Sequence, residues 1–229
     1  MWGMAAGCIV CGYLIGAIPF GLLIGRMRGV DVRKHGSGNI GATNVGRVLG
    51  ARYGLAAFAL DMLKGLVPVA VAGKWLHDQT SGMAGDTSQL WLWLGVGAAC
   101  ILGHMFPVYL RFKGGKGVAT SLGVILGFYP YFTWPGLVAF GLWIALTGVT
   151  GYVSVGSMVA AGAFPILFAL FAGLGEWGAM RYLWPLYIFA VTIGILVIYR
   201  HRSNVRRLMQ GTEPKIKLGR GRTEAKPEL

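Results

Sequence analysis

Ten residues at positions 112–121, FKGGKGVATS, combine glycines with a lysine in a way that suits phosphate binding. Such glycines can bring backbone N–H groups close to an anion, beside the charge of the lysine. The stretch does not match the Walker motif G-x-x-x-x-G-K-[ST], because Leu110 stands at the first glycine position and a glycine follows the lysine. A phosphate loop of another kind is therefore predicted. Its candidate contacts are Gly114, Gly115, Lys116 and Gly117.

The segment GSGNIGATNVGR, residues 36–47, is dense in small hydrogen-bonding groups. Its glycines match G-x-G-x-x-G, and Asp61 follows at the distance at which a dinucleotide-binding fold places an acid. We reject that site because no strand is predicted before the glycines and Asp61 lies in an apolar helix pattern, AFALDMLKG. A solvated loop could have this composition, but the other polar segments favour a binding site. Its candidate catalytic residues are Ser37 and Arg47. Asn39, Thr43 and Asn44 are expected to bind a substrate phosphate.

The segment HRSNVRRLMQGTE, residues 201–213, places His201 and Asn204 three residues apart among arginines, which makes both candidates for the same site.

Three further titratable groups lie in apolar helix patterns. Asp61 and Lys64 are spaced i, i+3 and predict a buried ion pair, and His104 is expected to bond a backbone carbonyl freed near Pro107. The chain has no carboxylate pair suited to a divalent cation and no H-E-x-x-H motif, so we predict no metal ion and no cofactor.

The composition of the chain indicates that these polar segments belong to a protein that lies in a membrane. Hydrophobic residues make up 55% of the chain, charged residues 13%, and the mean hydropathy is +0.61. An average soluble domain has roughly 25% charged residues, so a membrane protein surrounded by lipid is predicted. The net charge of +13 does not indicate a nucleic-acid partner, since Lys and Arg cluster between apolar runs, as expected of cytoplasmic loops. Cys8 and Cys11 form C-x-x-C inside an apolar run, without the second ligand pair of a zinc site.

The apolar runs predict an all-α integral membrane protein, a polytopic bundle with its N-terminus outside and its C-terminus in the cytoplasm. We favour seven transmembrane helices over five, because Pro-rich and Gly/Thr-rich breaks fall at helix-length intervals between residues 118 and 174. Small residues four apart, such as Gly12/Gly16, Gly21/Gly25 and Gly123/Gly127, suit close helix contact. The expected helices cover residues 4–25, 53–75, 90–110, 118–130, 131–147, 152–174 and 182–199.

Residues 1–210 are expected to form a single transmembrane domain, followed by a basic cytoplasmic tail, residues 211–229, that is partly disordered. In this topology the three polar segments emerge on the cytoplasmic face, where they could form one site.

Together the segments GSGNIGATNVGR, GHMFPVYLRFKGGKGVATS (residues 103–121) and HRSNVRRLMQGTE resemble the bacterial acyl-phosphate:glycerol-3-phosphate acyltransferases, the PlsY family. The resemblance covers nearly the whole chain and departs at Gly46, where a larger apolar residue is usual. It implies an enzyme of the inner membrane with its site in the cytoplasm. It also implies transfer of a fatty acyl group from acyl phosphate to the 1-hydroxyl of sn-glycerol 3-phosphate. The products would be lysophosphatidic acid and phosphate, in the first acylation step of phospholipid synthesis.

The resemblance also implies roles for single residues. Ser37 and Arg47 match an essential serine and arginine, and residues 114–117 match the glycerol 3-phosphate site. His201 and Asn204 match residues important for activity, and Glu213 matches a glutamate needed for integrity.

Acyl phosphate is an activated anhydride, so an enzyme that uses it needs to hold two phosphates together and a hydroxyl near a carbonyl. We expect the base to be His201 or a phosphate oxygen of the donor, and we favour the phosphate. An acyl-enzyme on Ser37 would need a base beside it, and the sequence places none adjacent. An anion transporter and a structural membrane protein are the other hypotheses. The transporter is disfavoured because the polar groups lie at one face rather than at mid-bilayer.

The alternation of charge between loops makes a testable prediction about topology. A cysteine introduced at Thr212 should react only with cytoplasmic label, and one at Ser81 only with external label. Labelling of position 212 from outside intact cells would contradict this arrangement.

Overall fold

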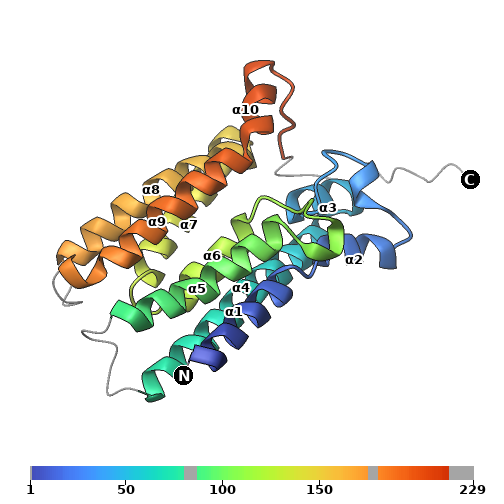
Figure 1. Ribbon diagram of the computed structural model, residues 1–229. Coiled ribbons are helices and arrows are strands. Elements are labelled where there is room, and N and C mark those ends of the chain that lie inside the picture. The colour runs from blue at the N-terminus through green and yellow to red at the C-terminus, as the bar shows by residue number, and fades with distance from the viewer. Residues whose placement is uncertain (1, 80–86, 175–179, 217–229) are drawn as a thin grey trace, which may run out of the picture.

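The protein is a bundle of helices in a computed structural model that describes residues 2–79, 87–174 and 180–216 (Figure 1). Ser81, Asp86 and Glu176, and the tail beyond residue 216, lie outside the described residues. No strand occurs in the described ranges. The α-helices are α1 (Trp2–Gly16), α2 (Phe20–Met27), α3 (Ala42–Leu49), α4 (Ala51–Gln79), α5 (Thr87–Met105), α6 (Val118–Gly127), α7 (Thr133–Thr150), α8 (Val153–Leu174), α9 (Met180–Arg200) and α10 (Arg202–Met209), with short 3₁₀ helices η1 (Val32–Lys34) and η2 (Val108–Leu110).

Six described segments are long and apolar enough to cross a membrane, so the prediction of a polytopic helical membrane protein is confirmed. They cover Ala6–Met27, Ala51–Asp78, Ser88–Leu110, Thr133–Thr150, Val153–Leu174 and Tyr182–Arg200. The remaining predicted helix, residues 118–130, corresponds to α6, which has 10 residues. A helix of that length is about 15 Å long, half of a bilayer core of about 30 Å. Seven crossings and the orientation of the termini stay predictions.

The first predicted helix, residues 4–25, is broken in the structure. Helix α1 ends at Gly16 and α2 begins at Phe20, because Pro19 has no N–H to continue the ladder and disfavours helical geometry before it. At the break, the carbonyl oxygen of Ile18 accepts a hydrogen bond of 2.7 Å from Lys64 Nζ and a weaker one of 3.1 Å from the Phe20 N–H. A polar group of the interrupted backbone is thereby satisfied inside the protein, as the membrane requires.

Helix α3, which lies within the loop predicted for residues 26–52, was not foreseen from the sequence. It packs along the start of α4, and the contact is close at Gly46 and Gly54. A Cβ on Gly54 would lie 2.7 Å from the Gly46 Cα. The glycine at position 54 therefore lets α3 lie against α4, whereas a Cβ on Gly46 would make an ordinary contact of 3.6 Å with the Gly54 Cα.

The membrane helices form two groups (Figure 1). Helices α1, α4, α5 and α6 pack together, and α7, α8 and α9 form a second group that contacts the first through α6–α7 and α5–α9. Buried aromatic rings join the groups: Phe132 lies 5.1 Å from both Phe164 and Phe168 and 5.3 Å from Phe128, centre to centre. Edge-on ring contacts of this kind stabilise packing beyond the burial of area.

Small residues permit the close approach predicted for two of the three glycine pairs. Gly12 and Gly16 face α5, and Gly123 and Gly127 face α4. Gly21 and Gly25 instead face the backbone of the loop at Ile40 and Val30, so this pair serves loop packing and not helix contact.

We predict that Gly123→Ala destabilises the protein while Gly141→Ala does not. A Cβ at Gly123 would overlap the Met62 carbonyl group of α4, whereas a Cβ at Gly141 meets nothing within 4 Å. Overpacking of this kind typically costs about 1–3 kcal/mol. Thermal unfolding in detergent measures the effect, and equal melting temperatures for the two variants would contradict it.

Candidate active site

A polar cavity of about 730 Å³, including its open mouth, collects residues from all three polar segments. The first segment contributes Ser37, Asn39, Thr43, Asn44 and Arg47; the second contributes His104, Lys116 and Gly117; the third contributes His201, Asn204, Arg207 and Glu213. Asp61 lines the cavity from α4. The cavity also has a wall from α7 and α8, with Trp143, Ser154 and Ser157. The expectation that the three segments meet is therefore fulfilled.

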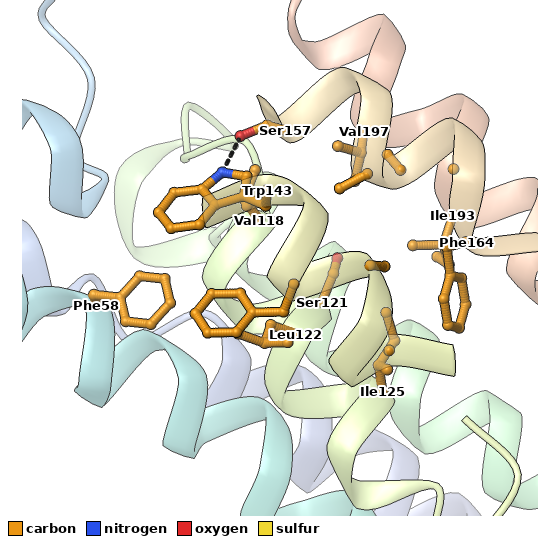
Figure 2. A pocket seen from close by; sticks show the side chains of 16 residues that line it. Phe58, Val118, Ser121, Leu122, Ile125, Trp143, Ser157, Phe164, Ile193 and Val197 are labelled. Carbon is orange, nitrogen blue, oxygen red and sulfur yellow. Dashed lines mark hydrogen bonds between the residues drawn. The ribbon is translucent and has the colours of Figure 1, made fainter. Parts of the chain in front are cut away.

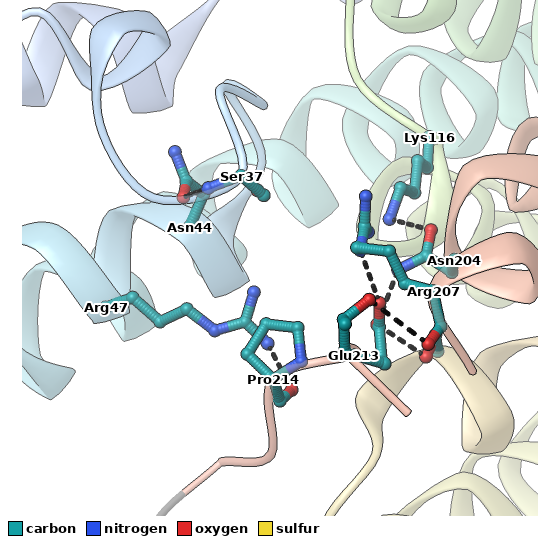
Figure 3. Close-up of polar contacts among 10 residues, drawn as sticks. Ser37, Asn44, Arg47, Lys116, Asn204, Arg207, Glu213 and Pro214 are labelled. Carbon is teal, nitrogen blue, oxygen red and sulfur yellow. Dashed lines mark hydrogen bonds and ion pairs between the residues drawn. The ribbon is translucent and has the colours of Figure 1, made fainter. Parts of the chain in front are cut away.

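Hydrogen bonds connect the second and third segments inside this cavity (Figure 3). Lys116 Nζ donates to Asn204 Oδ1 over 2.5 Å, and Asn204 Nδ2 donates to Glu213 Oε1 over 2.6 Å. The carboxylate also accepts from Ser154 Oγ at 2.8 Å and from Arg207 Nε at 2.7 Å. Asn204 and Glu213 are nearly inaccessible, at 4% and 7% exposure. The position of Lys116 thus depends on the buried carboxylate of Glu213, which lies in the segment that follows α10.

Residues 211–216 fold back onto the membrane domain. The Ile216 N–H donates to the Gly151 carbonyl over 2.8 Å, and Arg47 Nη2 donates to the Pro214 carbonyl over 2.9 Å (Figure 3). The described part of the predicted tail is therefore packed against α3 and the start of α8, and the domain extends past residue 210.

Burial tunes two titratable groups of the cavity. Burial lowers the pKa of Lys116 to about 8; the Glu213 carboxylate opposes this shift, and the nearby guanidinium of Arg207 adds to it. Burial and the Lys116 charge lower the pKa of His201 to about 4. His201 Nδ1 lies 2.7 Å from the Val197 carbonyl oxygen. Since a carbonyl only accepts, Nδ1 carries the proton, and Nε2 of this neutral ring is an acceptor.

Asn44 organises the first segment. Its Nδ2 group contacts the carbonyl oxygens of Val32 and Asn39, at 2.9 and 2.8 Å, and its Oδ1 accepts from the Ser37 N–H at 2.8 Å. Gly36, with φ of 59°, leaves no room for a Cβ beside this amide. Because these contacts are internal to the loop, we now propose that Asn44 positions Ser37 rather than binding phosphate itself.

The glycine loop is packed more tightly than the sequence suggested. The Gly114 N–H donates to the Met105 carbonyl over 3.2 Å, and the Gly115 N–H donates to the His104 carbonyl over 3.1 Å. These two amides are thus engaged with the end of α5, and the predicted phosphate cradle cannot use them in this conformation. A Cβ on either glycine would overlap α5, so packing explains why both are glycine. Phosphate binding by the loop is then left to Lys116 and Gly117, which line the cavity, and stays a proposal.

The predicted ion pair beneath the cavity is present. Lys64 Nζ lies 2.7 Å from Asp61 Oδ1, and His104 Nδ1 lies 3.6 Å from the same oxygen. His104 does not take the partner predicted for it, since its ring faces Asp61 and Gly115 rather than a carbonyl near Pro107. We retain the proposal that the three residues are structural, because Lys64 also holds the break at Ile18.

Figure 2 shows an apolar pocket of about 600 Å³, including its open mouth. It adjoins the polar cavity, with which it shares lining residues. The two share Phe58, Val118, Trp143 and Ser157, and Trp143 Nε1 donates to Ser157 Oγ over 3.1 Å at the boundary. From this boundary the pocket follows α6, α7, α8 and α9 to Ile125, Gly136, Phe164 and Ile193. It offers space for a hydrocarbon chain beside a polar site.

Several residues of this site were not predicted from the sequence. Ser154 and Ser157 lie three apart on one face of α8, but residues 152–174 were considered only as a transmembrane helix. Arg207 lies i+3 from Asn204 on α10, a spacing that would have indicated it. Phe58 and Trp143 carry no such signal, because aromatic residues are common throughout the apolar runs.

The fold and site together define a multi-pass helical membrane protein with a basic polar cavity opening beside an apolar pocket. The family model described as glycerol-3-phosphate acyltransferase matches residues 6–211. This chain belongs to that family, and it is accordingly an acyltransferase of phospholipid biosynthesis that acts on glycerol 3-phosphate. Family membership also decides against the transporter and the structural protein.

Individual relatives agree. The glycerol-3-phosphate acyltransferase of Geobacter sulfurreducens is 45% identical over 206 residues, covering 90% of this chain and 94% of its own. That of Aquifex aeolicus is 42% identical over 206 residues, covering 90% and 95%. Crystal structures of PlsY, an integral membrane glycerol 3-phosphate acyltransferase, superpose with a TM-score of 0.77. The glycerol 3-phosphate form is 38% identical and covers 93% of this chain and 96% of PlsY; the lysophosphatidic acid form is 37% identical and covers 93% and 95%.

The buried carboxylate makes a prediction about stability and pH. Burial raises the pKa of Glu213, but the hydrogen bonds from Asn204, Ser154 and Arg207 outweigh it, so the pKa lies below the usual value of 4.5. A lowered pKa stabilises the folded state above pH 4.5, and this contribution is lost as the pH falls.

Glu213→Gln should therefore lower the melting temperature at pH 7, by a destabilisation of about 1–3 kcal/mol. The difference from the unsubstituted protein should shrink as the pH falls below about 4.5. Lys215→Gln, two residues along the exposed segment, is the control. A difference independent of pH would show that the carboxylate charge is not involved.

Proposed function

We propose that the acyl donor is acyl phosphate and that the acceptor is the 1-hydroxyl of glycerol 3-phosphate, with lysophosphatidic acid and inorganic phosphate as products. The observation that carries the proposal is the shared boundary of the two cavities at Phe58, Val118, Trp143 and Ser157. An acyl chain in the apolar pocket would place its carbonyl at this boundary and its phosphate in the basic cavity. The PlsY structures in glycerol 3-phosphate and lysophosphatidic acid forms support this assignment.

The charges of the polar cavity suit two phosphate groups. Arg47, Lys116 and Arg207 supply positive charge, while the lining acids are already engaged, Glu213 with Arg207 and Asp61 with Lys64. Two phosphates held near each other repel, and fixed cations in a partly buried site offset this repulsion. Arg47 can hold a phosphate through two parallel N–H groups, which Lys116 cannot.

The reaction follows from positioning. The hydroxyl oxygen attacks the acyl carbonyl carbon, the bond from that carbon to the phosphate oxygen breaks, and the hydroxyl proton passes to the departing phosphate. His201 Nε2 is available as an acceptor to orient the hydroxyl, but with a pKa of about 4 its ring is a weak base. We therefore favour a phosphate oxygen of the donor as the base. Ser37, on the exposed loop at the cavity, is placed to donate to the developing oxyanion.

We further propose that residues 1–216 form one domain of the bacterial inner membrane, with its active site facing the cytoplasm. The basic loops on the side of the cavity support this orientation. No metal ion enters the proposed reaction, and the described residues contain no group of three His, Cys, Asp or Glu side chains that could hold one.

A donor comparison tests the proposed reaction. Purified protein in detergent is given glycerol 3-phosphate with either acyl phosphate or acyl-coenzyme A, and lysophosphatidic acid and phosphate are measured. We expect one phosphate released for each lysophosphatidic acid formed from acyl phosphate, and strong losses in Ser37→Ala and Arg47→Ala. Equal use of acyl-coenzyme A would overturn the choice of donor.

Lys116 makes a separate prediction. Lys116→Ala should raise the KM for glycerol 3-phosphate by about 10- to 150-fold, the equivalent of one charge-assisted hydrogen bond, with little change in kcat. Because the pKa of Lys116 is about 8, kcat/KM for glycerol 3-phosphate should fall as the pH rises through 8.

Lys116→Arg is the control for that pH dependence, since a guanidinium stays charged and the fall above pH 8 should disappear. A defect of Lys116→Ala confined to the KM for acyl phosphate would mean that the lysine holds the donor's phosphate instead.

A further inference from the structure

Arg200, the last residue of α9, reaches across to the loop that carries Lys116. Its Nη2 group donates to the Gly115 carbonyl over 2.7 Å and to the Gly114 carbonyl over 3.1 Å. A longer contact, of 3.4 Å, reaches the Met105 carbonyl at the end of α5. One guanidinium thus joins α9, α5 and the glycine loop.

The two glycines have no side chains, so the backbone alone holds them. Their N–H groups donate to the Met105 and His104 carbonyls of α5, which holds one side of the loop. Their carbonyl groups both accept from Arg200, which holds the other side. Without the guanidinium these part-buried carbonyl groups would lose a charged donor, and the loop would be attached to α5 only.

The junction of α9 and α10 contacts the loop a second time. Four residues beyond Arg200, Asn204 accepts from Lys116 Nζ over 2.5 Å. The junction therefore holds both the backbone of the loop and the amino group of its lysine. We propose that Arg200 is a positioning residue, which fixes the glycine loop so that Lys116 presents its charge to a substrate phosphate; this rests on the phosphate role proposed above for Lys116.

Arg200 acts through the lysine and not by touching substrate. It is not among the described residues that line the polar cavity, whereas Lys116 is. Its guanidinium also packs over the Phe106 ring, 5.1 Å from the ring centre, on the α5 side. A cation that contacts three carbonyls and one ring is placed to hold backbone in position.

Two measurements on Arg200→Ala test the proposal. Hydrogen exchange of residues 112–117 should become faster, because the loop loses its contact with α9. The KM for glycerol 3-phosphate should rise by about 10- to 150-fold with little change in kcat, the pattern expected of Lys116→Ala. Arg202→Ala is the matched control, since Arg202 is exposed and stacks over Tyr199 at 4.7 Å, and neither measurement should change.

A double variant separates positioning from general stability. When Lys116 is already alanine, Arg200→Ala should add little to the KM, because both substitutions remove one interaction. Equal fold losses with and without the lysine would overturn the proposal, as would unchanged exchange of residues 112–117 in the folded variant. If Arg200→Ala does not fold, Arg200→Lys takes its place, with one carbonyl contact kept and smaller effects of the same kind expected.

The result that would contradict the phosphate role of Lys116 differs from the result that would contradict the positioning role of Arg200. If Lys116→Ala alone keeps the KM of the unsubstituted protein, the lysine does not bind phosphate. Faster exchange in Arg200→Ala would then still support the contact between Arg200 and the loop, and unchanged exchange would overturn it.

Discussion

The hydrogen-bonded chain from Lys116 through Asn204 to Glu213 is the interaction on which the site depends. It joins the loop after α5, the short helix α10 and the returning end of the chain, three parts far apart in sequence. A charged group that is as little exposed as Glu213 is stable only when it is paired. The Glu213 carboxylate has three partners, which are Asn204, Ser154 and Arg207. The same pairing leaves Arg47 and the lysine amino group at the cavity, where we propose that they bind phosphate. Anchoring of the loop at its glycine carbonyls by Arg200 completes this arrangement from the membrane side.

The apolar pocket and the polar cavity correspond to the lipid and the water on the two sides of the membrane surface. Polar and basic groups gather where the helices end, and apolar groups line the space between α6, α7, α8 and α9. The boundary at Trp143 and Ser157 is where we propose that the acyl carbonyl and the hydroxyl of glycerol 3-phosphate meet. Small residues make this geometry possible, since Gly123 and Gly127 let α6 approach α4 closely. A larger side chain there would displace the helix whose first residue, Val118, lines both cavities.

Much of the fold could be predicted because hydropathy and charge act locally. The apolar runs located the long helices to within a few residues, and the polar segments contained most of the residues that now line the cavity. The features that were not predicted depend on contacts between residues that are distant in the sequence. Helix α3 was missed because its stability comes from packing on α4 at Gly54. The break near Pro19 has a local cause in the sequence, but nothing local shows that Lys64, on another helix, bonds to the Ile18 carbonyl. The glycine loop was interpreted as an open cradle, since nothing in its sequence shows that α5 carbonyls already occupy the amides of Gly114 and Gly115.

By itself, the sequence determined that this is a helical membrane protein, and it indicated the three polar segments that line the cavity, because composition and residue type need no partner to be recognised. The tertiary structure alone decided which side chains line the cavity and which partners the polar groups bond to. Asn44, predicted to bind phosphate, hydrogen-bonds to its own loop; Ser154, unnoticed in an apolar run, bonds to Glu213; and Arg200 turns toward the loop rather than the cavity. The physical reason is that a polar group buried at a membrane surface must find a donor or acceptor, and its partner is set by which helices pack together.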